Sequence, residues 1–134
     1  MIRFFICSSK IKLEVAKTRK NIRKTQNIKQ NLVLLINAGN ANAFTGKQGL
    51  LACEHKAQAL SSLFQCDIKN IFFSSTGVIG EQLPHQDIIK HLDLLKNKLS
   101  NSGLEAASKA ILTTDLKSKT YTKKFKIYNK VFTI

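Results

Sequence analysis

Two segments of this sequence combine small residues with side chains that donate and accept hydrogen bonds. The first runs from Asn37 to Gly46 and reads Asn-Ala-Gly-Asn-Ala-Asn-Ala-Phe-Thr-Gly. Its asparagines alternate with small residues, so their amide groups can come close to the backbone. These amides could satisfy the backbone of a turn or contact a bound molecule, and the composition leaves both interpretations open. Asn40 and Asn42 are therefore the weaker candidate site residues.

The second segment, Ser74 to Gly80, places hydroxyl side chains beside Gly77. A side-chain O–H and a backbone N–H that point in one direction can form an oxyanion hole, which stabilises charge that develops only in the transition state. Backbone nests that bind phosphate and ordinary strand-to-helix loops share this pattern. A third segment, Thr113-Thr114-Asp115, follows a predicted helix, and it could instead form the C-terminal turn of that helix.

Metal and thiol chemistry is not indicated by the sequence. The three cysteines show no ligand spacing, and the three histidines are scattered along the chain: Cys7, Cys53, Cys66, His55, His85 and His91. Unpaired cysteines without such spacing are typical of buried or idle thiols in a reducing compartment. We therefore expect no metal site and no cofactor.

The elements that would position these segments alternate between strand and helix. The apolar run Leu32 to Ile36 predicts a strand buried on both faces, and Asn37 to Ala43 predicts a tight loop after it. A helix is expected over 48–65, because apolar residues recur there at helical spacing. These residues are Leu50, Cys53, Ala57, Leu60 and Phe64. A second short buried strand is expected over Asn70 to Ser74, before the second special loop.

Further elements are expected on either side of this central part. A helix over 84–99 is predicted from Pro84 and an apolar stripe, and Ser102-x-x-Glu105 is a capping box that would open a helix through Leu112. Alternating residues from Phe125 onward predict a hairpin that turns at 128–130. At the start, Ile2 to Phe5 predicts a strand, and Lys10 to Gln30 predicts a short strand with a solvated helix or loop. This order of elements indicates an α/β protein.

Composition and charge limit the function classes. The chain has 134 residues, which supports a single domain, and it is 43% hydrophobic, as globular proteins are. No apolar stretch approaches the ~20 residues that span a bilayer, so we expect a soluble, cytoplasmic protein that does not bind membranes.

The net charge of +14 is concentrated at the two ends of the chain. Residues 1–30 carry +8, residues 31–114 only +1, and residues 115–134 carry +5. Only three of the 22 basic residues are arginine and tryptophan is absent, whereas nucleic-acid sites favour arginine and stacking aromatics. We therefore expect no specific nucleic-acid partner, although a basic non-enzymatic nucleic-acid-binding protein remains an alternative function.

Taken together, three segments resemble the ornithine acetyltransferase family, the bifunctional glutamate N-acetyltransferases of arginine biosynthesis. They are Asn37 to Gly46, the segment Ser75-Thr-Gly-Val-Ile-Gly-Glu81, and Ala110-Ile-Leu-Thr-Thr-Asp115, in the same order and with similar gaps. The resemblance runs from about Leu32 to Ile134, and more loosely back to Phe4. It implies an αββα sandwich of the N-terminal-nucleophile type, in which a precursor cuts itself before a threonine into α and β chains. That threonine takes the acetyl group from acetylornithine, or from acetyl-CoA, and passes it to glutamate.

The resemblance also assigns roles to residues of this chain. Thr76 and Gly77 match the oxyanion hole of the family, and Thr113 matches its substrate-contacting threonine, with Thr114 a weaker candidate. The partners implied are a β chain that carries the nucleophilic threonine, in a heterotetramer, and the substrates acetylornithine, glutamate and acetyl-CoA.

The chain also departs from the family pattern. In the family, the segment that matches Lys123 to Ile134 is followed by a Lys-Gly-Ser-Gly segment and the Ala-Thr cleavage site, neither of which follows here. Gln82 stands where the family commonly has proline, and 116–119 differ as well. We therefore expect a single partial domain over 1–134, an α-chain segment incomplete at both ends and inactive alone. The alternative is an inert gene remnant.

Overall fold

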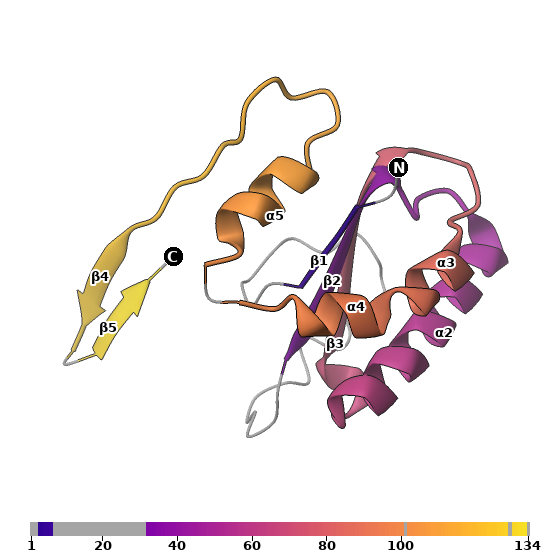
Figure 1. Ribbon diagram of the computed structural model, residues 1–134, viewed down its shortest axis with the longest axis horizontal. Helices are drawn as coiled ribbons and strands as arrows, with labels where there is room; N and C mark the ends of the chain where they lie inside the picture. Colours follow the sequence, from indigo (N-terminus) through magenta and orange to yellow (C-terminus); the bar gives the residue numbers. More distant parts are fainter. Residues whose placement is uncertain (1–2, 7–31, 101, 129, 134) are drawn as a thin grey trace.

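The computed structural model describes residues 3–6, 32–100, 102–128 and 130–133, and they form a mixed α/β protein, as predicted (Figure 1). The predicted elements of Lys10 to Gln30 lie outside these residues. Among the helices in the described ranges, none is long and apolar enough to cross a membrane.

Within the described residues, three strands form the central sheet, in the order β1-β2-β3. Strand β1 (Arg3–Ile6) pairs antiparallel with β2 (Val33–Asn40), and β2 pairs parallel with β3 (Ile71–Val78). Parallel neighbours need a crossover connection, which here contains helix α2 (Gly46–Phe64) and the short 3₁₀ helix η1 (Ile68–Asn70). The carboxyl ends of β2 and β3 therefore lie side by side at one edge of the sheet.

Strands β2 and β3 are longer than predicted, so two predicted boundaries were wrong. The sequence predicts a loop from Asn37 and another from Ser74, but β2 continues to Asn40 and β3 continues to Val78. The register pairs Asn37 with Ser75 and Asn40 with Val78, so the two segments satisfy their backbone groups by pairing with each other. Turn-forming composition is a local signal, and it is overridden here by pairing between segments far apart in the sequence.

Helix α2 confirms the helix predicted over 48–65, but its buried face is shifted from the predicted stripe. Leu50 is 49% exposed and Phe64 is only partly buried. The buried residues of α2 are Gly49, Ala52, Cys53, Lys56, Ala57 and Leu60. A lysine therefore lies on the face that packs against the sheet.

The main core lies between one face of the sheet and the helices α2, α3 (His85–Lys90) and α4 (Leu92–Asn97). The strands contribute Val33, Leu35, Ile71 and Phe73, and the helices contribute Cys53, Ala57, Leu60, Ile88 and Leu92. In Figure 1, α2 lies to one side of the strands and α5 (Leu104–Ala110) to the other. Leu34, Ile36 and Phe72 form a smaller buried cluster.

The helix predicted over 84–99 is broken into two at His91. The Nδ1 atom of His91 lies 2.7 Å from the carbonyl oxygen of Asp87, while the N–H of His91 donates to the oxygen of Ile88 at 3.1 Å. The His91 imidazole therefore occupies the Asp87 carbonyl oxygen, which in a continuous α-helix would accept from the backbone N–H of His91. That N–H instead makes a hydrogen bond to residue i−3, as in a 3₁₀ helix. The predicted apolar positions Ile88 and Leu92 are nevertheless buried.

Helix α5 lacks the predicted capping box. Its N-cap residue is Gly103, and in the described part of the chain no side chain caps the helix. Ser102 Oγ lies 3.2 Å from Ser100 Oγ, and Glu105 Oε1 accepts from Lys109 Nζ at 2.7 Å. Both side chains of the expected box therefore have other partners. The N-cap lies one residue later than predicted, and the helix ends two residues earlier than predicted.

The predicted hairpin is confirmed. Strands β4 (Lys124–Ile127) and β5 (Lys130–Thr133) pair antiparallel, with Ile127 opposite Lys130. Tyr128, in the short connection, has a φ of 52°. Two-residue hairpin loops need such left-handed backbone, which explains how the turn forms without glycine. In Figure 1 the hairpin projects away from the central sheet.

Candidate functional site

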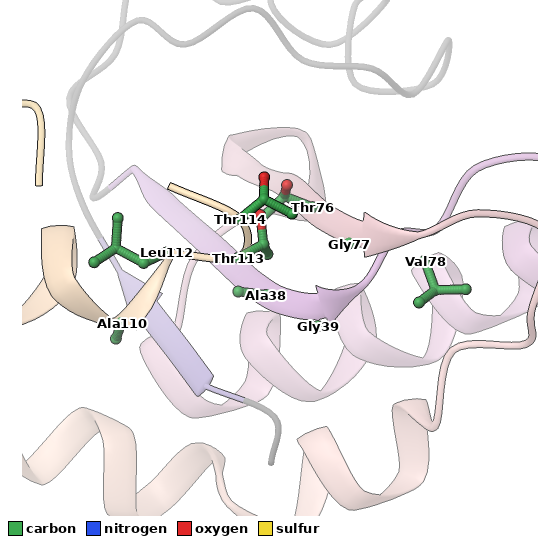
Figure 2. A pocket seen from close by; sticks show the side chains of 9 residues that line it. All are labelled: Ala38, Gly39, Thr76, Gly77, Val78, Ala110, Leu112, Thr113 and Thr114. Atoms are coloured by element: carbon green, nitrogen blue, oxygen red, sulfur yellow. The ribbon is translucent and has the colours of Figure 1, made fainter. Parts of the chain in front are cut away.

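A hollow of about 690 Å³ lies where the carboxyl ends of β2 and β3 meet the segment that follows α5 (Figure 2). Its walls come from three parts of the chain: Ala38 and Gly39; Thr76, Gly77 and Val78; and Ala110, Leu112, Thr113 and Thr114. In α/β sheets, ligand sites form beyond the carboxyl ends of parallel strands. The position of this hollow is therefore typical of a binding site.

The hollow brings together residues that the sequence singles out separately. Thr76 and Gly77 come from β3, whereas Thr113 and Thr114 come from the end of the α5 segment, more than 30 residues later. Figure 2 shows the side chains of Thr76, Thr113 and Thr114 grouped at one place. Three hydroxyl groups near one strand end can donate to, or accept from, a polar ligand.

Two glycines face each other at the wall of the hollow. Gly39 and Gly77 are register partners, with φ values of 105° and 128°. A Cβ on Gly77 would lie 2.6 Å from the carbonyl oxygen of Gly39 and 2.7 Å from the nitrogen of Asn40. Glycine is therefore required at 77 both by the backbone angle and by the close approach of β2.

The candidate residues Asn40 and Asn42 do not line this hollow. The Nδ2 atom of Asn42 donates to the Gly49 oxygen at 2.9 Å, and its Oδ1 accepts from Thr45 Oγ1 at 2.7 Å. The side-chain amide of Asn42 therefore makes hydrogen bonds to other residues of the protein. Asn40 Nδ2 is 3.5 Å from the Glu81 oxygen, and its buried Oδ1 has no hydrogen-bond partner among the described residues.

Cysteine and histidine give no sign of a metal centre in the described part of the chain. No three or more histidine, cysteine, aspartate or glutamate side chains gather there in an arrangement that could hold a metal ion. Cys53 and Cys66 are free and buried, and burial raises the pKa of the Cys66 thiol. The structure does bring His55 Nδ1 and His85 Nε2 to 3.2 Å from each other, across α2 and α3.

Sequence reasoning missed a buried lysine on the other face of the sheet. Lys56 is 2% exposed, and its Nζ lies 4.7 Å from the centroid of the Phe73 ring. It lines a cavity of about 10 Å³, room for at most about one water molecule. Burial therefore lowers the pKa of Lys56, although the neighbouring Cys53 thiol partly offsets this effect. Lys56 lies three residues after Cys53 and four residues before Leu60, and this helical spacing could have predicted that it shares their buried face.

Replacing Lys56 with methionine is expected to increase the free energy of unfolding at pH 7 by about 1–3 kcal/mol, because it removes a poorly solvated charge from the core. The folded pKa lies below the unfolded pKa, so the unfolded chain binds more protons between these values and stability rises with pH there. The advantage of Lys56→Met should therefore shrink at pH values above the ordinary lysine pKa. Urea denaturation at several pH values measures it.

The matched control for this prediction is Lys47→Met, which changes an exposed lysine on the same helix. We expect it to leave the free energy of unfolding within about 0.5 kcal/mol of wild type, as surface substitutions usually do. A Lys56→Met variant that is less stable than Lys47→Met at neutral pH would show that the contact with Phe73 outweighs the cost of burying the charge.

Comparison with known proteins gives a consistent result. The model of the ArgJ family matches residues 6–134. The arginine biosynthesis bifunctional protein ArgJ of Gluconobacter oxydans is 49% identical over 82 residues, 61% of this chain and 19% of that protein. The ArgJ protein of Caldanaerobacter subterraneus is 35% identical over 101 residues, 75% of this chain and 25% of that protein. The chain thus spans about a fifth to a quarter of these relatives.

Two solved structures are similar over most of the chain. The arginine biosynthesis bifunctional protein ArgJ of Bacillus halodurans has a TM-score of 0.62 and 26% identity, over 98% of this chain and 68% of that one. The ornithine acetyltransferase of Mycobacterium tuberculosis, solved with ornithine, has a TM-score of 0.62 and 25% identity, over 91% of this chain and 63% of that one.

Proposed function

The chain belongs to the ArgJ family, and from that membership we propose that it takes part in acetyl transfer from acetylornithine to glutamate in arginine biosynthesis. The observation that carries the proposal is the hollow at the ends of β2 and β3. Its wall combines Thr76, Gly77 and Thr113, the residues that match the family's oxyanion hole and substrate contact.

In this proposal, Thr76 and Gly77 stabilise the negative charge of the tetrahedral intermediate. The Thr76 hydroxyl and the Gly77 N–H donate to the oxygen that becomes an oxyanion when the acetyl carbonyl is attacked. Thr113 contacts the substrate, and Thr114, on the same wall, is a second contact. The glycine at 77 supports this role, because a residue without Cβ exposes its N–H to a ligand.

The attacking group that we propose is a threonine at the N-terminus of a β chain, which autocatalytic cleavage of a precursor exposes in this family. Its hydroxyl oxygen bonds to the acetyl carbon and its proton passes to the α-amino group, which serves as base. Ornithine leaves with that proton. The amino group of glutamate then attacks the threonine ester and takes the acetyl group, and its proton returns through the α-amino group to the threonine oxygen as the ester bond breaks. Acetyl-CoA is a second proposed acetyl donor, and no cofactor is required.

The proposed assembly is an αββα sandwich in which this chain supplies the α-chain part. We propose that β chains complete the sandwich in a cytoplasmic heterotetramer and bring the nucleophilic threonine close to Thr76. Strands that pair in sheets with a second chain would also cover apolar side chains that are exposed here, among them Ile79 and Val131.

The test compares the purified chain alone, a β chain alone and the two chains co-expressed, with acetylornithine and glutamate as substrates. The β chain can be taken from the Gluconobacter oxydans relative. We expect acetylglutamate to form only with the two chains together. Turnover by the isolated chain would contradict the proposed division of labour. Chains that never associate, or that associate without any turnover, would favour an inert remnant.

A further inference from the structure

The loop between β2 and α2 holds β3 on both sides of the proposed oxyanion donors. Before Thr76, the N–H of Asn42 donates to Ser75 Oγ at 2.9 Å. After Gly77, the N–H of Ala41 donates to the carbonyl oxygen of Val78 at 2.8 Å. Because successive strand side chains point to opposite faces, Ser75 faces α2 while Thr76 faces the hollow. The loop therefore fixes the donors from behind.

A third hydrogen bond continues this attachment beyond the strand. The N–H of Gly80 donates to the carbonyl oxygen of Ala43 at 3.0 Å. Gln82 Nε2 also lies 3.3 Å from the carbonyl oxygen of Thr45. Residues 41–45 thus contact the segment 75–82 at four points, and the position of one segment determines the position of the other.

The side chain of Asn42 anchors this loop to α2. Its Nδ2 donates to the Gly49 carbonyl oxygen at 2.9 Å and lies 3.1 Å from Cys53 Sγ. Its Oδ1 accepts the hydroxyl proton of the buried residue Thr45, whose Oγ1 is 2.7 Å away. Asn42 is partly buried, and three contacts hold its amide group, so the side chain has one preferred position.

Gly49 shows that the helix makes room for this amide. A glycine within a helix is less stable than alanine by about 1 kcal/mol. A Cβ at 49, however, would lie 2.5 Å from Asn42 Oδ1 and would also clash with Thr45 Oγ1. The helix therefore has a residue of poor helix propensity at a position where a side chain would displace the Asn42–Thr45 pair.

We propose that Asn42, held by Thr45 and Gly49, is a positioning residue for the donors Thr76 and Gly77. This inference rests on the proposed function and adds a residue that acts through Ser75 instead of touching substrate. Oxyanion donors work only when they lie about 2.7–3.1 Å from the developing charge. A misplacement of about 1 Å can lower the rate about 100-fold. A loosened loop should therefore slow the chemical step without weakening substrate binding.

The test uses a matched pair of variants at Thr45 in the co-expressed complex. Thr45→Val keeps the shape of the side chain but removes the hydroxyl donor to Asn42, whereas Thr45→Ser keeps the donor. We expect Thr45→Val to lower kcat about 10- to 100-fold with KM within about twofold of wild type, and Thr45→Ser to restore most of kcat. A kcat within twofold of wild type for Thr45→Val, with a lower melting temperature, would overturn the proposal.

A second measurement separates this inference from the proposed function. The chain has six glycines, so labelling it with ¹⁵N-glycine gives few amide signals. We expect the Gly77 signal to move in Thr45→Val and to stay in place in Thr45→Ser, even if the wild-type complex shows no turnover and the proposed function fails. If Thr45→Val does not fold, Ser75→Ala, which removes the acceptor of the Asn42 N–H, takes its place. An unmoved Gly77 signal in the folded variant would contradict the inference.

Discussion

Replacing Thr76 with alanine is expected to lower kcat about 100- to 1,000-fold in the complex with a β chain, while KM stays close to the wild-type value. The hydroxyl of Thr76 lies on the wall of the hollow and is proposed to donate to the oxyanion. A donor that acts only on charge formed in the transition state changes the chemical step and not ground-state affinity. Steady-state kinetics with acetylornithine and glutamate measure both constants.

Thr76→Ser is the control for this prediction, because it keeps the hydroxyl and should keep most of kcat. Thr76 is only partly buried, so neither change should unfold the chain, and thermal melting of each variant checks this. If Thr76→Ala raised KM and left kcat unchanged, the hydroxyl would bind the substrate in its ground state, and the oxyanion role would be wrong.

Much of the fold could be predicted because its signals are local. The apolar runs at Leu32 to Ile36 and Ile71 to Phe73 located β2 and β3, whose buried residues begin at Val33 and Ile71. The helical period of the apolar residues located α2, although its buried face is shifted from the predicted stripe. The ends of these strands could not be predicted. Asparagine, glycine and serine are typical of turns. At these strand ends they adopt strand conformation because two segments far apart in the sequence pair with each other.

The helix errors have a similar cause. The break between α3 and α4 depends on one hydrogen bond, from the His91 side chain to the carbonyl oxygen of Asp87. A histidine within an apolar stripe does not by itself predict such a hydrogen bond. The predicted capping box before α5 does not form, because the Glu105 carboxylate accepts a hydrogen bond from Lys109 one turn later in the helix. Side chains with several possible partners make element boundaries the least predictable part of a fold.

Some residues of the candidate site could be predicted from the sequence, and others could not. Thr76, Gly77 and Thr113 were selected by resemblance of three short segments to a family, and the structure places all three at one hollow. Residue types alone allow three interpretations of the segment around Gly77: an oxyanion hole, a backbone nest that binds phosphate, or an ordinary loop. The role of Asn42 in joining the loop to α2 was not accessible, because it depends on Gly49 and Thr45 after the helix has formed.

Gly77 offers a test of the fold beneath the site. Gly77→Ala is expected to lower the free energy of unfolding by about 2–6 kcal/mol, the sum of two effects of about 1–3 kcal/mol each. The first is strain, because the φ of 128° is one that residues with a Cβ rarely adopt. The second is overlap, because the new methyl group would lie 2.6 Å from the Gly39 carbonyl oxygen. Urea denaturation of the variant and the wild type measures the difference.

Gly80→Ala separates these two effects. Gly80 also has a positive φ, of 86°, but a Cβ there would meet no atom within 4 Å. Gly80→Ala should therefore lower the free energy of unfolding only by the backbone strain, about 1–3 kcal/mol. The excess loss in Gly77→Ala then measures how tightly β2 and β3 approach each other at the Gly39–Gly77 pair. Equal losses in the two variants would mean that the strands move apart at little cost, and that this approach does not hold the Gly77 N–H in place at the hollow.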